Sequence, residues 1–248
     1  MMLNALDDSL IYPKPDTIQL PTHCNTISVI NPVMPLEFTL PENVISTLIA
    51  TYAMFGTKRR IDNRSVNTLC QSPIYRIRNY DINFAKYLSD ALATYLPAQL
   101  TFNERSRVDW ESDNPEKYNV WNLIGISPYF RYVEYTSGSD SFPRYNRAYN
   151  SPTDPLTRTL MSGIIYLTDN EDGATAFIDD KQDHLPHRDR NLKAREYPAT
   201  YDEIYEWSIP KRGNIIVFPH GECHSVLSTT ETRKTIRFDV YYSAYSKK

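Results

Sequence analysis

Glycine, cysteine and histidine are all scarce in this sequence, and each scarcity excludes a class of site. The 248 residues include seven glycines, three cysteines and five histidines. The glycines form neither the G-x-G-x-x-G turn of a dinucleotide-binding fold nor the G-x-x-x-x-G-K-S/T loop that cradles phosphates. The cysteines, at positions 24, 70 and 223, form no C-x-x-C pair and leave one thiol unpaired in any disulfide scheme. We therefore expect a reducing, cytoplasmic location without a zinc ribbon.

An excess of charge and a long apolar run are missing as well. Lys and Arg number 27 against 30 Asp and Glu, so the net charge of -3 gives no basic field for nucleic acid. The most apolar helical stretch, 44–55, is well short of the roughly 20 residues that span a bilayer. Residues 1–20 carry three aspartates without an apolar core, unlike a signal peptide. We expect a small molecule, a peptide or a protein as partner, and neither nucleic acid nor a membrane.

Two amphipathic helices precede a series of short strands. From Pro41 onward, apolar residues recur at three- and four-residue spacing, and the pattern returns from Asp81, a good N-cap, until Pro97 stops it. The β-rich runs that follow are 129–135, 160–167, 175–178, 214–218 and 235–242. This order predicts an α+β domain in which helices cover one face of an antiparallel sheet or barrel.

The last predicted strand has one apolar and one polar face. By the two-residue period of a strand, the apolar set is Ile236, Phe238 and Val240, and the polar set is Arg233, Thr235, Arg237 and Asp239. If the apolar face packs on the helices, Arg233 and Arg237 point into the mouth of the sheet, where an anion is their natural partner. The alternative is a solvated face with ion pairs to Asp239.

Two segments near the carboxyl end resemble a known family. Residues 214–226 read NIIVFPHGECHSV and residues 232–242 read TRKTIRFDVYY. They resemble the closing segment of the Fe(II)/2-oxoglutarate-dependent oxygenases of the prolyl-hydroxylase type. In that family a strand ending in Phe leads to the distal iron-ligating His, and a basic residue further on binds the 5-carboxylate of 2-oxoglutarate. The resemblance implies His224 for iron and Arg233 for 2-oxoglutarate, with Lys234 and Arg237 competing for the second role.

The resemblance extends upstream over about residues 35–245. Residues 125–138 look like the family's first barrel strand and Tyr-x-x-Gly turn, and 164–177 is similar to its Tyr-Leu-Asn and Gly-x-Thr-x-Phe segment. The implied fold is a double-stranded β-helix, the jelly-roll barrel of these enzymes. By the same resemblance Tyr135 and Tyr166 contact 2-oxoglutarate. The implied parts are an extended arm (1–34) and a single oxygenase-like domain (35–248), with helical support (41–97), barrel (120–245) and a charged insertion (179–207).

The sequence departs from the family where the proximal iron ligands are expected. The family's Phe-x-x-His-x-Asp pattern falls on 142–147, FPRYNR, which places Tyr145 in the His position and Arg147 in the Asp position. Fe(II) in this family prefers two imidazoles and one carboxylate, and a guanidinium has no lone pair to offer. His187 and Asp189 form a His-x-Asp later in the chain, which with His224 has the right ligand types. The alternative for this segment is a charged surface loop.

Two functions from different classes stay open. With Fe(II) and 2-oxoglutarate bound, the resemblance implies hydroxylation of a peptidyl or small-molecule C–H bond. Without a metal, a catalytically degenerate relative would keep a cationic cavity as an anion-binding or protein-interaction module, lined by Tyr135, Tyr145, Tyr166, Arg147, Arg233 and Arg237. Outside this cavity, we expect His220 to form local hydrogen bonds at the barrel rim.

Overall fold

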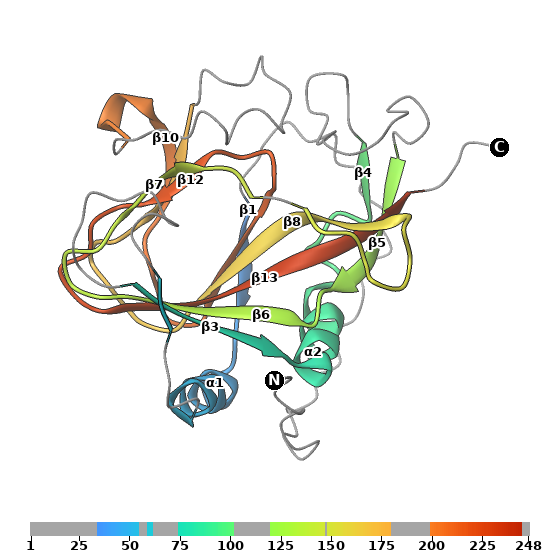
Figure 1. Cartoon of the computed structure of the whole chain (residues 1–248), viewed down its shortest axis with the longest axis horizontal. Helices are drawn as coiled ribbons and strands as arrows, with labels where there is room; N and C mark the ends of the chain where they lie inside the picture. Colours follow the sequence, from blue (N-terminus) through green and yellow to red (C-terminus); the bar gives the residue numbers. More distant parts are fainter. Residues whose placement is uncertain are drawn as a thin grey trace.

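The computed structural model describes residues 34–54, 59–61, 74–101, 120–146, 148–179 and 199–244 (Figure 1). Almost all of the predicted arm and most of the predicted charged insertion lie outside these residues, as do Arg147, His187 and Asp189. The division of the chain that we predicted from the family therefore stays a prediction.

Two antiparallel sheets form the body of the molecule. The larger runs in the order β1 (Met34–Thr39), β11 (Asn214–Pro219), β8 (Thr157–Tyr166), β13 (Arg233–Ala244), β6 (Tyr129–Tyr135), β3 (Ile74–Tyr80) and β2 (Arg59–Ile61). At the far end of β13, β5 (Val120–Ile126) and β4 (Gln99–Thr101) join it. The smaller runs in the order β10 (Ile204–Ser208), β9 (Thr175–Ile178), β12 (His224–Val226) and β7 (Ser141–Arg144), and a 3-10 turn (Tyr201–Glu203) precedes β10.

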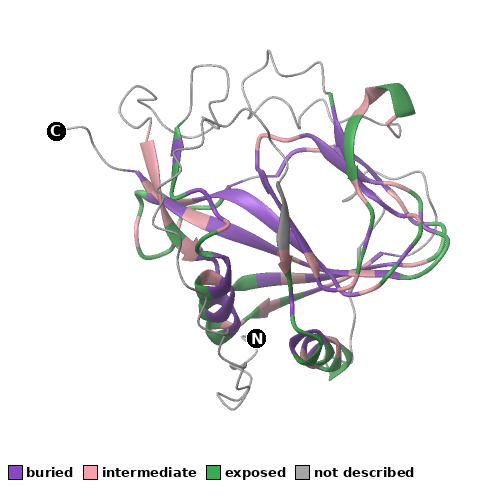
Figure 2. Cartoon of the chain, turned by 180° about the vertical axis from the view of Figure 1, so that it is seen from behind, coloured by how far each residue is buried: buried purple, intermediate pink, exposed green. Residues whose placement is uncertain are grey.

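Both helices cover the outer face of the larger sheet, and the smaller sheet lies on its other side (Figure 1). α1 spans Glu42–Met54 and α2 spans Ile82–Leu92. Asp81 caps α2 as predicted, because its Oδ1 accepts a hydrogen bond of 2.8 Å from the Phe84 amide. In Figure 2 the helices are buried toward the sheet and exposed away from it, the arrangement that the helical periodicity predicts.

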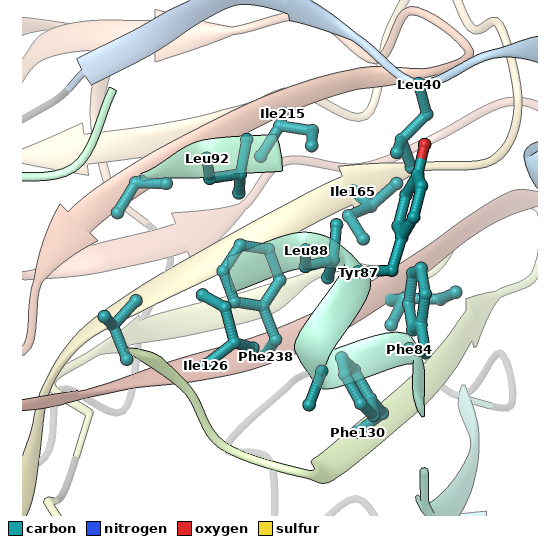
Figure 3. Close-up of a cluster of buried hydrophobic side chains, with 14 of the residues drawn as sticks. Leu40, Phe84, Tyr87, Leu88, Leu92, Ile126, Phe130, Ile165, Ile215 and Phe238 are labelled. Atoms are coloured by element: carbon teal, nitrogen blue, oxygen red, sulfur yellow. The ribbon is translucent and has the colours of Figure 1, made fainter. Parts of the chain in front are cut away.

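The apolar face of β13 packs into the core between the helices and the larger sheet. Ile236 and Phe238 are fully buried against the helices, and Phe238 lies beside Leu88 of α2 (Figure 3). Phe238 stands opposite Gly163 of β8, where an added Cβ would lie 2.0 Å from the Phe238 Cζ. The ring therefore occupies the space that any side chain at residue 163 would need. The predicted apolar face of the last strand is confirmed.

The predicted order of helices first and strands afterwards is only partly right. β6 and β9 have the predicted bounds, and β11 and β13 extend beyond theirs. β8 begins three residues earlier and ends one residue earlier than predicted. However, β1 precedes the first helix and β3 lies between the helices, in the segment that we predicted as helical support. α2 also ends at Leu92, and a turn rather than helix continues to Pro97. Among the described residues, no helix is long and apolar enough to cross a membrane.

Candidate functional site

The polar face of β13 lines a cavity between the two sheets, as the period of the strand predicts. Its volume is about 50 Å³. The described residues around it are Arg76, Arg131, Val133, Tyr135, Arg144, Ile164, Thr175, Phe218, His224, Val226, Arg233, Thr235 and Arg237. We call it the arginine cavity. It brings together four residues that the sequence pointed to from distant segments, namely Tyr135, His224, Arg233 and Arg237.

Five arginines converge on this small volume from four strands. Arg76 comes from β3, Arg131 from β6 and Arg144 from β7, and the other two come from β13. No carboxylate is among the described residues that line the cavity. Positive charge without an equal negative charge in a partly buried space is costly, so the arrangement favours an anionic ligand.

Arg233 is held rigidly at one end of the arginine cavity. Its side chain is 1% exposed, and a terminal nitrogen donates a hydrogen bond of 2.8 Å to Thr175 Oγ1. The guanidinium carbon lies 5.2 Å from the ring centre of Tyr135 and 5.4 Å from that of Tyr166. Stacking between two aromatic rings replaces part of the hydration that the cation has lost. Tyr166 itself lies behind Arg233 and donates its hydroxyl to Thr175 Oγ1.

The pKa values of the lining groups show how strong the positive field is. Burial would raise the pKa of the Tyr135 hydroxyl, but the charges of Arg144 and Arg233 bring it below its usual value. Burial, followed by repulsion from Arg144 and other arginines, lowers the pKa of Arg76 to about 10 despite a favourable effect of Tyr135. A bound anion would relieve this repulsion.

Several guanidinium nitrogens at the arginine cavity are buried without an acceptor among the described residues. They are the Nε atoms of Arg76, Arg233 and Arg237 and one terminal nitrogen of Arg144. A buried donor without an acceptor costs about 1–3 kcal/mol, and more when it carries charge. These nitrogens would gain most from a ligand with several acceptor oxygens.

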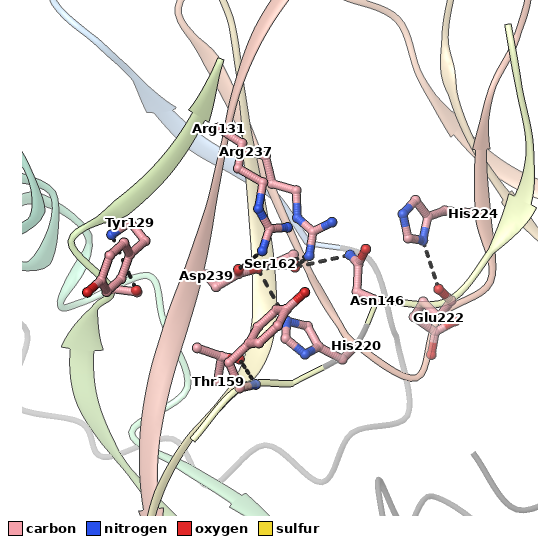
Figure 4. Close-up of polar contacts among 12 residues, drawn as sticks. Tyr129, Arg131, Asn146, Thr159, Ser162, His220, Glu222, His224, Arg237 and Asp239 are labelled. Carbon is pink, nitrogen blue, oxygen red and sulfur yellow. Dashed lines mark hydrogen bonds and ion pairs between the residues drawn. The ribbon is translucent and has the colours of Figure 1, made fainter. Parts of the chain in front are cut away.

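His224, the predicted distal iron ligand, begins β12 directly opposite Arg144 of β7. Its ring is buried and lies 4.9 Å from the ring of Phe218. The Nδ1 atom lies 3.0 Å from the backbone carbonyl oxygen of Glu222 (Figure 4). Because a carbonyl oxygen only accepts, Nδ1 carries the proton and Nε2 is left with its lone pair. Burial, and then the charge of Arg144, lowers the pKa of His224, so the ring stays neutral.

The described residues do not fit an iron ion. Among them, no group of three His, Cys, Asp or Glu side chains could hold a metal ion. His224 lies instead in the field of Arg144 and Arg237, which repels a cation. The alternative ligands His187 and Asp189 lie outside the described residues.

Tyr145 does not line the arginine cavity in the described structure, so its predicted place there is wrong. It packs against Ile178 and Cys223 on the other side of the smaller sheet. Its neighbours on either side point inward: Arg144 lines the cavity, and the Asn146 amide donates a hydrogen bond of 3.0 Å to Ser162 Oγ. The alternation of an extended chain therefore places residues 144 and 146, and not 145, inside the barrel.

A buried carboxylate, Asp239, organises the next part of the inward face (Figure 4). Its Oδ1 accepts hydrogen bonds from Ser162 Oγ at 2.6 Å and from Arg237 at 3.1 Å, and its Oδ2 lies 3.5 Å from Arg131. Burial raises the pKa of Asp239, but Arg237 and His220 outweigh this effect and keep it well below the usual range. The ion pair that we predicted as an alternative is thus present for Arg237, whereas Arg233 does not take part in it.

His220 belongs to the same cluster. Its ring is fully buried, and Nε2 lies 3.4 Å from Asp239 Oδ1, so the predicted position at the rim is wrong. Burial lowers the pKa of His220 more than the Asp239 charge raises it. The ring therefore stays neutral beside the carboxylate at neutral pH.

A second and larger cavity, of about 360 Å³, lies beyond this cluster. It is lined by Arg78, Ser127, Tyr129, Phe130, Arg131, Tyr149, Asn150, Pro152, Thr159, Asp239 and Tyr241. Arg131 borders both cavities, and its guanidinium lies 5.4 Å from the ring centre of Tyr149. The ion pairs of Asp239 with Arg131 and Arg237 therefore separate the two cavities.

The sequence pointed to only part of this site. The residues missed are Arg76, Arg131 and Arg144. Arg131 has the same strand parity as Tyr135, so the two-residue period would have found it. Arg76 could not be found because β3 was predicted as part of a helical segment, and Arg144 was passed over when its neighbour Tyr145 was aligned with the family's histidine.

Comparison with solved structures identifies the fold. No protein-family model and no curated protein matches the sequence. A prolyl-4-hydroxylase from Pseudomonas putida matches with a TM-score of 0.50 and 12% identity, over 85% of this chain and 92% of that one. A prolyl hydroxylase from Trichoplax adhaerens, in complex with a peptide fragment of hypoxia inducible factor, matches with a TM-score of 0.50 and 10% identity, over 86% of this chain and 84% of that one. The epimerase SnoN of nogalamycin biosynthesis, in complex with Fe³⁺, alpha ketoglutarate and nogalamycin RO, matches with a TM-score of 0.52 and 12% identity, over 87% of this chain and 81% of that one.

The class of fold is therefore the double-stranded β-helix of the Fe(II)/2-oxoglutarate oxygenases, as predicted. Prolyl hydroxylases stand foremost among the structures that this chain resembles. At such low identity the likeness establishes the fold, and the function has to be argued from the site.

Proposed function

We propose that this chain is a catalytically degenerate protein with the oxygenase fold, and that it binds an anion in the arginine cavity. The observation that supports this proposal is the convergence of five arginines around His224 with no carboxylate among the described lining residues. In such a site each charge-assisted hydrogen bond to an anion contributes about 1.5–3 kcal/mol. The arginines are already partly desolvated in the folded chain, so the ligand does not have to remove all of their water.

The loss of the metal site is the second part of this proposal. We infer that Arg144 and Asn146, which point inward two residues apart, stand where the family has its His-x-Asp pair. A guanidinium cannot ligate a metal, and Arg144 lies opposite His224 on the neighbouring strand. This assignment replaces the alignment of Tyr145 and Arg147 with the iron ligands.

The family's cosubstrate is the first anion to test. By the family resemblance, Arg233 and Arg237 would bind a carboxylate of 2-oxoglutarate, with Tyr135 beside it. Tyr166, which the resemblance also implies, is not among the residues that line the cavity and donates to Thr175 instead. Isothermal titration with 2-oxoglutarate, succinate and phosphate would detect anion binding without any metal.

Arg144 is the arginine whose substitution tests the proposal. We expect Arg144→Gln to weaken anion binding about tenfold or more, the equivalent of one charge-assisted hydrogen bond. Arg212→Gln is the matched control, because Arg212 pairs with Glu42 at the surface far from the cavity. The absence of binding for all three anions, or equal binding by Arg144→Gln and the unmodified chain, would overturn the proposal.

An active oxygenase remains the second candidate, because the tautomer of His224 favours it. The hydrogen bond from Nδ1 to Glu222 leaves the Nε2 lone pair for a metal, as in many metal-binding histidines. His187 and Asp189 would then have to supply the other ligands, and Fe(II) with 2-oxoglutarate would supply the oxidising chemistry. By analogy with the similar structures, the substrate would be a C–H bond of a peptide or small molecule.

Metal content and succinate release separate the two candidates. The anion-binding proposal predicts protein purified without chelator that contains no stoichiometric iron and releases no succinate from 2-oxoglutarate. Stoichiometric iron, together with 2-oxoglutarate turnover that His224→Ala abolishes, would establish the oxygenase instead.

A further inference from the structure

We propose that the arginine cavity selects a tetrahedral oxyanion that carries a proton, namely hydrogen phosphate. The proposal rests on the anion-binding function above and specifies its ligand. It predicts discrimination against sulfate, which has the same shape but no proton, and against 2-oxoglutarate, which is larger.

The volume of the arginine cavity limits the size of the ligand. A cavity needs roughly 10–15 Å³, measured with a water-sized probe, for each water molecule that it holds. The 50 Å³ of the arginine cavity therefore admits a group of about four or five heavy atoms. A tetrahedral oxyanion has about this size, whereas 2-oxoglutarate has about twice as many heavy atoms and would require the sheets to move apart.

The donors of the arginine cavity surround the ligand from several directions. Arg76 and Arg144 approach from the strands β3 and β7, and Arg233 and Arg237 come from β13. Each has a buried nitrogen that lacks an acceptor among the described residues. Guanidinium groups that converge from different strands match the oxygens of a tetrahedral dianion better than a single planar carboxylate.

A lining group that can only accept a hydrogen bond gives the cavity its selectivity, whereas the hydroxyls of Tyr135, Thr175 and Thr235 can also donate. Because His224 donates through Nδ1 to the Glu222 carbonyl, its Nε2 can only accept a hydrogen bond. Toward an oxyanion without a proton, such as sulfate, the Nε2 lone pair would face an oxygen lone pair and repel it. Hydrogen phosphate carries the same charge but places an O–H opposite Nε2, so that both partners are satisfied.

The Glu222 carbonyl fixes this acceptor role. If Nδ1 gave up its proton to Nε2, the lone pair of Nδ1 would face the carbonyl oxygen at 3.0 Å, in a buried site that excludes a compensating water. The backbone therefore fixes the tautomer of His224 before any ligand binds, and the ligand does not have to select this tautomer.

Titration of the full chain with matched anions at constant ionic strength and neutral pH tests the proposal. We expect phosphate to bind about tenfold or more tightly than sulfate, since one favourable hydrogen bond is replaced by one repulsion. We also expect phosphate to bind more tightly than 2-oxoglutarate.

His224→Phe is the decisive variant, because it keeps an aromatic ring against Phe218 and removes the acceptor. We expect the ratio of sulfate to phosphate affinity to rise to near one. Arg212→Gln, which breaks the surface pair with Glu42, is the control and should leave the ratio unchanged. Thermal unfolding without ligand verifies that each variant is folded.

The outcomes separate this proposal from the function on which it rests. Sulfate that binds as tightly as phosphate, 2-oxoglutarate that binds more tightly than phosphate, or a ratio that His224→Phe leaves unchanged would overturn the selectivity and leave anion binding intact. If none of these anions binds, both proposals fail.

Discussion

At the scale of single residues, the inward face of the barrel depends most on Asp239. This carboxylate is the acceptor for Arg237 and Ser162, and it lies close to Arg131 and His220. A buried charge with several partners is stable only as long as all of them are present. Two predictions follow from this cluster, one on charge and one on pH.

Asp239→Asn should destabilise the fold strongly, because it removes a buried negative charge and leaves the half-buried Arg131 and Arg237 without compensation. Breaking a buried ion pair costs about 3–5 kcal/mol. We expect a loss of this order in the free energy of unfolding, measured by urea denaturation. Glu42→Gln, which breaks the exposed pair with Arg212, is the control and should have little effect.

Stability should fall in mild acid because of His220. Burial lowers its pKa in the folded chain, whereas the unfolded chain keeps a value of about 6.5, so the unfolded state binds more protons below that pH. The free energy of unfolding should therefore decrease as the pH falls below about 6.5, by up to about 1.4 kcal/mol per pH unit for this group. The charged groups that face His220 are Asp239, which raises its pKa, and Arg237 and Arg131, which lower it.

The measurement is urea denaturation from pH 7.5 to 5.5, with the unmodified chain and His220→Gln compared at each pH. The variant should show a shallower decrease, with a remainder from His224, whose pKa is also lowered. An equally steep decrease in both proteins would contradict the assignment to His220.

At the scale of the elements, the sequence predicted five strands, including the four-residue β9, and missed others, among them β3, β7 and β12. The alternation predicted both faces of β13 correctly, since apolar and polar residues strictly alternate over 235–240. β3 alternates less clearly, because its buried face carries Arg76 beside Ile74, and a charged residue there looks like surface. β7 and β12 have four and three residues, too few for a period, so only their pairing shows that they are strands.

The contact between β8 and β13 should tolerate no side chain at residue 163. An added Cβ in Gly163→Ala would overlap the Phe238 ring, and overpacking of this kind typically costs about 1–3 kcal/mol. We expect a corresponding loss in the free energy of unfolding. In the double variant Gly163→Ala with Phe238→Leu, the smaller side chain should recover part of the loss, giving a non-additive cycle. Strict additivity would show that the two residues do not interact as described.

At the scale of the whole molecule, a net negative chain encloses a strongly positive cavity. The net charge is -3, yet five arginines meet at one point between the sheets. Composition averages over the molecule, so it could not reveal this concentration of charge. The family resemblance gave the fold and the place of the cavity, and only the paired strands show which side chains fill it.

Binding of an anion should stabilise the entire chain, because only the folded state assembles the cavity. Phosphate at 100 times its dissociation constant should raise the free energy of unfolding by about 2.7 kcal/mol. Thermal unfolding in phosphate, compared with sodium chloride at equal ionic strength, measures this effect. Phosphate also stabilises proteins in general by exclusion from their surface, so the specific part is the difference that Arg144→Gln removes. An equal shift in both proteins would contradict specific binding.

Strand β13 has a consequence for how the chain can vary. In most surface strands every second position is free to change, but here alternate residues enter either the core or the arginine cavity. Substitutions at neighbouring positions should therefore fail for different reasons: those at 236, 238 and 240 by unfolding, and those at 233 by loss of ligand. In a saturation library of this strand, defective variants should sort by even and odd residue number into these two phenotypes, except at 237 and 239, where the loss of the buried ion pair also unfolds the chain.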